Sequence, residues 1–250
     1  MTNSLVAVFS GGLDSTTMVY DALYRGFEIK RLVSFNYGQR HKKELVFAAI
    51  TADKLNLPHT VIDLWSSGLT EALVPSGSSL ISDTEVPDGH YSEENMKSTV
   101  VPNRNMIMIS IAGGIAVAEG ANGVVIGVHA GDHAIYPDCR PHFIEMVSRT
   151  LGVANLGFAD FMVAGPVLAP YINQSKADIA RDALQLEVPL EDTWSCYKGE
   201  EIHCGRCGTC VERLEAIDDA LSILDDGTFQ DRTEYADTEY WKYVTKGKVK

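Results

Sequence analysis

The stretch Ser10-Gly11-Gly12-Leu13-Asp14-Ser15, called the glycine loop below, decides how the rest of the chain is interpreted. An apolar run at residues 5–9 precedes it and is typical of a buried strand, while residues 15–23 behind it have helical spacing. We therefore expect the loop at a strand-to-helix turn. Adjacent glycines let backbone amides approach an anion closely, and a helix N-terminus adds partial positive charge. The pattern predicts a phosphate cradle.

The side chains of the glycine loop extend this prediction. The hydroxyls of Ser10 and Ser15 can donate hydrogen bonds, and the Asp14 carboxylate suits Mg²⁺. The common nucleotide loop G-x-x-x-x-G-K-[ST] is absent, because no lysine follows the glycines. The order S-G-G-x-D-S instead resembles the loop of enzymes that cleave ATP between its α- and β-phosphates, adenylate a substrate oxygen and release pyrophosphate. A glycine-rich turn that merely opens a helix is the competing interpretation.

Composition narrows the function classes. The chain has 250 residues, 45% of them hydrophobic and 22% charged, which is ordinary for a globular protein of one large domain or two small ones. The formal net charge of −13 argues against direct nucleic-acid binding, because phosphate backbones require a basic surface. No run of 18 apolar residues and no signal pattern occurs, so we expect a cytoplasmic protein without a membrane partner.

The order of the predicted elements indicates the fold. Residues 29–35 form an expected second strand, residues 42–56 an amphipathic helix and residues 59–64 a third strand. This βαβαβ order predicts an α/β fold with a doubly wound, mostly parallel, Rossmann-like sheet and helices on both faces. The later predicted elements are helices at 106–119, 142–151 and 211–224, a helix capped by Asn173 or Ser175, a strand at 123–128 and a short strand within 161–168.

Two features divide the chain. Between residues 65 and 100 the periodicity fades and Gly, Ser, Pro and Asp dominate, which predicts a long loop; a mobile lid and simple disorder both fit. We expect residues 1–190 to form a nucleotide-binding domain. Residues 191–250 are expected to form a small zinc-binding segment, a closing helix and an acidic tail, packed on the same domain.

Polar residues at the ends of predicted elements are candidates for the site. Ligands of open α/β sheets bind at the carboxyl ends of strands, so loops 36–41 and 129–140 are expected to face a nucleotide. Arg104, at a helix entry, has the planar fork that binds phosphate or carboxylate. Lys176 lies in a first helical turn, where the dipole disfavours a cation unless it meets an anion. A solvated side chain is the alternative for both.

Four of the five cysteines follow the spacing C-x7-C-x2-C-x2-C at Cys196, Cys204, Cys207 and Cys210. Four thiolates so close together, with glycines between them, predict a closed tetrahedral zinc site. An iron–sulfur cluster is the main rival, because four cysteines ligate those as well. Crowded thiols also suit a metal site in a reducing compartment better than disulfides.

Several motifs occur in one order along the chain: the glycine loop, residues 35–41, Tyr136-Pro137-Asp138-Cys139-Arg140, residues 193–197 and the cysteines. Together they resemble the 7-cyano-7-deazaguanine synthase family of the PP-loop ATP pyrophosphatase superfamily, over about residues 5–213. The resemblance implies a carbon–nitrogen ligase of queuosine biosynthesis. ATP would adenylate the carboxylate of 7-carboxy-7-deazaguanine, ammonia would displace AMP, and a second ATP would activate the amide before the nitrile preQ0 forms. A homodimer using ATP, Mg²⁺ and Zn²⁺ is implied.

The motifs and the resemblance together assign expected roles to residues. Catalytic roles are expected for Asp14, Ser15, Arg104 and Lys176. ATP is expected to contact Phe9, Ser10, Gly11, Gly12, Leu13, Asp14, Ser15, Thr16, Thr17, Phe35, Tyr37, Gly38, Gln39, Arg40 and His41. The deazapurine is expected to contact Arg104, Asp132, Tyr136, Asp138, Cys139 and Arg140, with the Asp138 carboxylate accepting from the guanine-like edge. The four cysteines would hold zinc.

Two stretches depart from the family pattern. Asp132-His133-Ala134-Ile135 stands where many relatives have Asp-Tyr-Ser-Gly, and Asn103 stands where they often have Gly. Both flank the expected substrate pocket, so a ligase that stops at the amide, or joins the deazaguanine to another amine (including a protein amine), is an alternative. A tRNA-modifying PP-loop enzyme and a non-catalytic zinc-bearing interaction module are further alternatives, disfavoured by the acidic charge and the intact glycine loop respectively.

Overall fold

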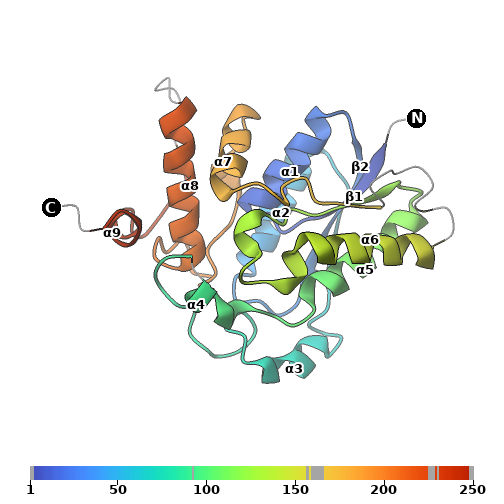
Figure 1. The fold of residues 1–250 in the computed structure, drawn as a ribbon, viewed down its shortest axis with the longest axis horizontal. Coiled ribbons are helices and arrows are strands. Elements are labelled where there is room, and N and C mark those ends of the chain that lie inside the picture. The colour runs from blue at the N-terminus through green and yellow to red at the C-terminus, as the bar shows by residue number, and fades with distance from the viewer. Residues whose placement is uncertain are drawn as a thin grey trace.

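A computed structural model describes residues 3–91, 93–155, 158, 166–224, 229 and 231–247. Its centre is a parallel five-stranded sheet in the order β3-β2-β1-β4-β5 (Figure 1). Strands are added on one side of β1 and then on the other, which is the doubly wound arrangement, so the predicted α/β fold is confirmed. The strands are β1 (Ser4–Val8), β2 (Glu28–Asn36), β3 (His59–Asp63), β4 (Gly123–Val125) and β5 (Val167–Leu168).

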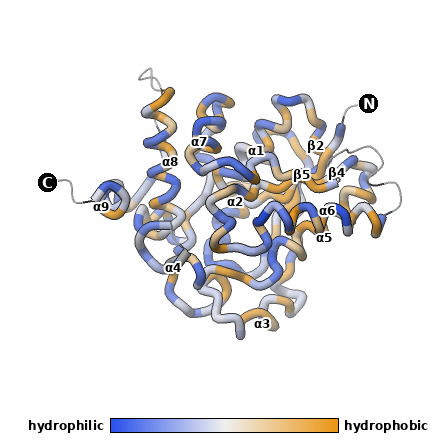
Figure 2. The backbone as a smooth tube through the Cα atoms, viewed as in Figure 1, coloured by the Kyte–Doolittle hydropathy of each residue, from blue (hydrophilic) through white to orange (hydrophobic). Residues whose placement is uncertain are grey.

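Helices cover both faces of the sheet because successive residues of β1 point to opposite sides. Leu5 and Ala7 pack in one apolar cluster with α1, α2 and α7, whereas Val6 packs in another with α5 and α6. Strands β1, β4 and β5 are accordingly mostly apolar (Figure 2). These helices are α1 (Leu13–Tyr24), α2 (Lys43–Leu55), α5 (Arg104–Ala118), α6 (Pro141–Ala154) and α7 (Lys176–Gln185).

Strand β4 is shorter than the predicted strand at 123–128. Its neighbour β5 ends at Leu168, so only Ile126 gains one further hydrogen bond, from its N–H to the Leu168 carbonyl at 2.9 Å. Residues 126–128 continue as chain outside the ladder and are free to border a cavity. Of the short strand predicted within 161–168, only Val167 and Leu168 form β5, and residues 161–165 lie outside the described part.

The long connection at 65–100 is folded where the structure describes it. It holds the short helices α3 (Leu69–Leu73) and α4 (Glu93–Met96), with 3-10 turns at Val74–Ser76 and Lys97–Thr99. Leu80 and Met96 are buried in the apolar core under α5. Simple disorder is therefore the wrong interpretation for these residues, while a lid function stays a prediction.

The C-terminal part adds α8 (Gly208–Leu224) and α9 (Tyr240–Thr245). Ala216 and Ile217 of α8 pack against Ala180 and Ala183 of α7. The division into residues 1–190 and 191–250 stays a prediction, and the tail's predicted start at 225–227 lies outside the described residues. Within the described ranges, no helix combines the length and apolarity needed to cross a membrane.

Candidate active site

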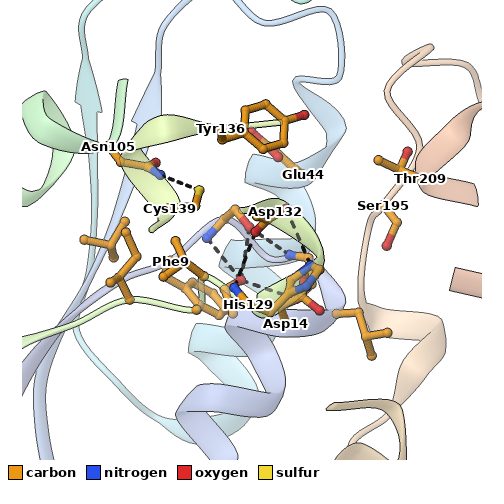
Figure 3. Close-up of a pocket in the computed structure, with 18 of the residues that line it drawn as sticks. Phe9, Asp14, Glu44, Asn105, His129, Asp132, Tyr136, Cys139, Ser195 and Thr209 are labelled. Carbon is orange, nitrogen blue, oxygen red and sulfur yellow. Dashed lines mark hydrogen bonds and ion pairs between the residues drawn. The ribbon is translucent and has the colours of Figure 1, made fainter. Parts of the chain in front are cut away.

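A cavity of about 200 Å³ lies at the carboxyl ends of β1 and β4 (Figure 3). This is the point where strand addition reverses, and ligands of doubly wound sheets bind in the crevice there. The cavity borders the glycine loop and the residues just after β4, as the sequence predicted for a nucleotide site. Most of its lining comes from residues 8–15, 35–45, 104–108, 126–139 and 194–212.

The glycine loop is shaped to present backbone amides. Gly11 has φ +78°, and a Cβ at this position would lie 2.5 Å from the Ala48 amide nitrogen of α2, so only glycine fits. The hydroxyls of Ser10 and Ser15 lie 3.0 Å apart, and the Gly12 N–H donates to Ser10 Oγ at 3.2 Å. Helix α1 has no side-chain cap, which leaves its N-terminus available to an anion. This geometry fits a phosphate cradle.

Beside the glycine loop lies a group of ionisable side chains, called the charged cluster below. Lys176 Nζ donates to Asp14 Oδ2 at 2.7 Å and lies 3.6 Å from Glu212 Oε2. His129 Nε2 lies 3.9 Å from Asp14 Oδ2 and 3.6 Å from Asp132 Oδ1. Two carboxyl groups thus contact Lys176, and a third, on Asp132, faces His129. The cluster comprises Asp14, His129, Asp132, Lys176 and Glu212.

Asp14 and Lys176 of the charged cluster favour their charged forms although both are largely buried. Burial alone would raise the pKa of Asp14, but the Lys176 ammonium and His129 outweigh it, so the pKa is lowered. Burial would likewise lower the pKa of Lys176, and Asp14 and Glu212 raise it instead. Asp14 Oδ1 is buried and has no hydrogen-bond partner in the described structure. An orphaned carboxylate oxygen next to further carboxylates fits Mg²⁺.

The second group is called the aromatic cluster and comprises Tyr37, His41, Glu44, Arg104, Tyr136 and Tyr197. The Arg104 guanidinium lies 5.7 Å from the centre of the Tyr136 ring, and the rings of His41 and Tyr197 stack at 4.7 Å. Within the described chain, no carboxylate oxygen lies within 4.0 Å of the Arg104 side chain. A partly buried guanidinium without an acidic partner in contact is suited to an anionic ligand.

Glu44 holds a carboxyl group inside the aromatic cluster. The residue is only 8% exposed, and its Oε1 accepts a hydrogen bond from Gln39 Nε2 at 2.8 Å. Its Oε2 lies 3.4 Å from His41 Nε2. Burial raises the pKa of Glu44 to about 8 and lowers the pKa of His41 to about 3. Both groups are therefore mainly neutral at pH 7.

The predicted deazapurine residues are only partly brought together. Arg104, Asp132, Tyr136 and Cys139 line the cavity. Asp138 Oδ2 instead accepts from the N–H of Asn105 at 2.9 Å, in the first turn of α5.

Arg140 is exposed and donates from Nε to the His133 carbonyl at 2.8 Å. Asp138 and Arg140 are thus not among the described lining residues. Burial raises the pKa of the Cys139 thiol, which disfavours a nucleophilic role.

The predicted ATP residues divide in the same way. Those that line the cavity are Phe9, Ser10, Gly12, Leu13, Asp14, Ser15, Phe35, Tyr37 and His41, and the predicted catalytic Lys176 joins them. The predicted ATP residues that are not part of the described lining are Gly11, Thr16, Thr17, Gly38, Gln39 and Arg40. Gln39 is buried and supports the wall, because its Oε1 accepts from the Tyr37 N–H at 2.8 Å.

The cysteine cluster lies behind one wall of this cavity. All four Sγ atoms of Cys196, Cys204, Cys207 and Cys210 lie within 4.8 Å of one another, and all four residues are buried. Backbone N–H groups of Cys204 and Cys207 donate to cluster sulfurs at 3.5 and 3.3 Å. Four buried thiols at this spacing fit one metal ion in a closed site.

The sequence neighbours of the cysteines reach the cavity. Ser195 and Tyr197 flank Cys196, Thr209 precedes Cys210, and Glu212 follows it by two residues; all four line the cavity. Ser195 and Thr209 lie across the cavity from Asn105 and Cys139 (Figure 3). A metal held by the four thiols would therefore fix two separate stretches of one cavity wall.

A family model described as "Queuosine biosynthesis protein QueC" matches residues 4–221. The chain belongs to this family. The 7-cyano-7-deazaguanine synthases of Brucella ovis and Brucella suis are each 48% identical to it over 241 residues, which cover 96% of this chain and 97% of theirs. A structure of NMN synthetase from Francisella tularensis is similar over 99% of this chain and 87% of that one, with 14% identity and a TM-score of 0.47.

The structure adds residues to the site of this QueC family member that the sequence did not single out. Glu44 stands in the first turn of α2, where an acidic residue is ordinary and gives no signal. Glu212 follows the last cysteine by two residues, and nothing in the cysteine spacing indicates that it lines the cavity beside Lys176. His129 follows the apolar run 123–128, and its place at the carboxyl end of a predicted strand could have identified it as a site residue.

Proposed function

We propose that this chain is a 7-cyano-7-deazaguanine synthase, which converts 7-carboxy-7-deazaguanine and ammonia to the nitrile with cleavage of ATP to AMP and pyrophosphate. The named relatives support the reaction. The observation that carries it is one cavity that contains both a phosphate cradle and a partly buried guanidinium without an acidic partner in contact. Such a cavity has a place for a departing pyrophosphate and a place for a carboxylate.

The chemistry needs both places. A carboxylate is a poor electrophile until its oxygen carries a leaving group, so the substrate oxygen first attacks the α-phosphorus of ATP and pyrophosphate departs. Ammonia then adds to the carbonyl carbon, the C–O bond to AMP breaks, and the amide forms. The amide oxygen attacks the α-phosphorus of a second ATP and a second pyrophosphate departs. Loss of AMP and of the two remaining N–H protons then leaves the nitrile. Arg104 would hold the carboxylate, and Lys176 would stabilise the negative charge that develops on the phosphates.

We infer a metal ion in each of two places. Asp14, with its orphaned Oδ1, would hold Mg²⁺, aided by Asp132 and Glu212. When bound, this ion neutralises charge on the phosphates of ATP. The four cysteines would hold Zn²⁺, whose closed tetrahedral shell suits a structural role.

The same proposal includes the setting of the enzyme. We propose a homodimer that takes free ammonia, in a reducing compartment such as the cytoplasm, because clustered thiols there bind metal and do not form disulfides. The net charge of −13 supports a small-molecule substrate without direct nucleic-acid contact. Light scattering after size exclusion should give twice the chain mass of 27.3 kDa, and a monomer would contradict the dimer.

The test is a complete reaction with ATP, MgCl₂, 7-carboxy-7-deazaguanine and ammonium chloride. We expect AMP and pyrophosphate to form only when the base is present, with two AMP released for each nitrile detected by mass spectrometry. One AMP per amide, with no nitrile, would instead support a ligase that stops at the amide. If no AMP forms, the proposal is wrong.

A further inference from the structure

The described cavity lining contains four carboxyl groups, on Asp14, Glu44, Asp132 and Glu212. Three of them are engaged in the charged cluster: Asp14 and Glu212 share Lys176, and Asp132 accepts from Tyr91 Oη at 2.9 Å and faces His129. Glu44 differs, because it lies outside the charged cluster and, in the described chain, has no lysine or arginine nitrogen within 4.0 Å of its carboxyl group. Of the four, it is the carboxyl group that remains for a neutral ligand edge with N–H donors.

The position of the Glu44 side chain is fixed from behind. Gln39 Nε2 donates both to Glu44 Oε1 at 2.8 Å and to the Phe35 carbonyl at 2.9 Å, which ties the carboxyl group to the end of β2. Its main chain touches the glycine loop, since a Cβ on Gly11 would lie 2.6 Å from the Glu44 carbonyl. The carboxyl group is thus held beside the phosphate cradle, at the cavity surface.

The surroundings of Glu44 suit a flat heterocycle. His41 and Tyr197 stack beside it, and Tyr37 and Tyr136 line the same region of the cavity. Aromatic side chains bind bases by stacking, and this contact tolerates any base. Selection among bases therefore needs polar groups at the edge. A guanine-like edge presents a ring N–H beside an amino group, two donors that match the two oxygens of one carboxylate.

We propose that Glu44 recognises the guanine-like edge of the substrate base, with its two carboxylate oxygens accepting the ring N–H and an amino N–H. This inference rests on the proposed function for the identity of the base, and it gives Glu44 the role that the sequence suggested for Asp138. Asp138 is placed to cap α5, with its oxygen on the Asn105 N–H. Each carboxylate oxygen has two acceptor sites, so the bond from Gln39 to Oε1 persists.

The ionisation of Glu44 gives the proposal a pH signature. The ionisable groups facing Glu44 are His41 and Tyr37, which are neutral, and Arg104, whose charge only partly offsets burial. With a pKa of about 8, free Glu44 is mostly protonated at pH 7 and must release that proton to water before both oxygens can accept. Affinity for the 2-amino base should therefore rise from pH 6 to pH 8.

The experiment measures binding of two ligands by calorimetry without ATP: 7-carboxy-7-deazaguanine and its analogue that lacks the 2-amino group. Wild-type protein should bind 7-carboxy-7-deazaguanine more tightly than the analogue. Glu44→Gln should weaken binding of 7-carboxy-7-deazaguanine by about 10–100-fold and affect binding of the analogue much less. Glu145→Gln, on an exposed residue of α6, is the matched control and should keep the wild-type preference. Equal weakening of both ligands, or loss of the preference in Asp138→Asn, would overturn the proposal.

The pH dependence of wild-type binding keeps the proposal testable if Glu44→Gln does not fold. The preference for the amino ligand should grow between pH 6 and pH 8, and a flat preference contradicts a role for Glu44. Binding is measured apart from turnover, so the two proposals fail separately. A chain that discriminates through Glu44 but makes no AMP refutes the proposed reaction alone; one that makes the nitrile with unchanged discrimination in Glu44→Gln refutes this inference alone.

Discussion

The charged cluster and the aromatic cluster line one cavity, but burial has opposite outcomes for key ionisable groups in the two. Charged forms are favoured in the first and neutral forms in the second. In the charged cluster, Lys176 and Asp14 stabilise each other's charge at 2.7 Å, and both pKa values move toward the ionised forms. In the aromatic cluster, Glu44 and His41 have no such partner, and burial moves both pKa values toward the neutral forms. The direct hydrogen bond between Lys176 and Asp14 outweighs burial for that pair, whereas burial raises the pKa of Glu212, 3.6 Å from Lys176.

This difference indicates how the cavity divides its ligands. Preserved ions are suited to a highly charged ligand such as the triphosphate of ATP with its metal. Neutral, stacked groups are suited to a flat base, and Arg104 alone keeps a charge there for a carboxylate. One wall that borders both clusters comes from residues flanking the cysteines, so the two clusters share the cysteine cluster as a support.

Removing that shared support should have the largest effect. Cys207→Ser should release the metal and disorder both clusters, with several kcal/mol lost from the free energy of unfolding, because structural zinc sites contribute folding energy directly. Elemental analysis and denaturant titration measure the two changes. Cys139→Ser, on a buried cysteine outside the cluster, should retain the metal. Full AMP formation by metal-free Cys207→Ser would show that the wall needs no metal.

The charged cluster is tested next by Lys176→Met. Loss of the ammonium leaves Asp14 and Glu212 without their partner, so their pKa values rise and the developing phosphate charge is not stabilised. We expect kcat for AMP formation to fall about 10²–10³-fold, measured by chromatography of AMP. Lys54→Met, at an exposed lysine paired with Asp192, is the control and should keep the wild-type rate. A Lys176→Met variant with a wild-type rate would remove this residue from catalysis.

The aromatic cluster is tested by Arg104→Lys. A lysine keeps the charge but lacks the bidentate fork, so KM for 7-carboxy-7-deazaguanine should rise about 10-fold while KM for ATP changes little. Steady-state kinetics with each substrate varied in turn separate the two constants. An effect confined to ATP would place Arg104 with the phosphates and would break the division between the clusters.

The smallest effect concerns stability and follows from Glu44. Its pKa is about 8 in the folded protein against an ordinary value of 4.5, so the folded state keeps a proton that the unfolded state has lost. Stability contributed by Glu44 is complete below pH 4.5 and falls as the pH rises toward 8. From pH 6 to pH 7, the unfolding free energy of Glu44→Gln should rise by roughly 1 kcal/mol relative to that of the wild-type protein. A difference in unfolding free energy that does not change with pH would contradict the raised pKa.

The sequence predicted what depends on local order. The glycine loop, the residues after β2 and the four cysteines each carry their signal within a few positions, and the element order predicts the doubly wound sheet. Lys176 was predicted as an anion contact from its place in a first helical turn, and its partner proved to be Asp14, far away in the chain.

What the sequence did not predict depends on packing between distant segments. Glu44 belongs to an ordinary amphipathic helix, and only the approach of β2 and α5 turns it into a cavity residue. Asp138 shows the converse, because a polar loop at a strand end indicated a ligand contact and the adjacent helix α5 took up its carboxylate. The charge state of each buried group likewise follows from its three-dimensional neighbours.

The most direct test of the division between the clusters is a pair of dissociation constants measured on two variants. The ligands are a non-cleavable ATP analogue and 7-carboxy-7-deazaguanine. Lys176→Met should raise the dissociation constant of the ATP analogue at least 10-fold and change that of the base by no more than about twofold. Arg104→Lys should raise the dissociation constant of the base and leave that of the analogue nearly unchanged. If both variants weaken the same ligand and spare the other, the cavity does not divide its ligands as described.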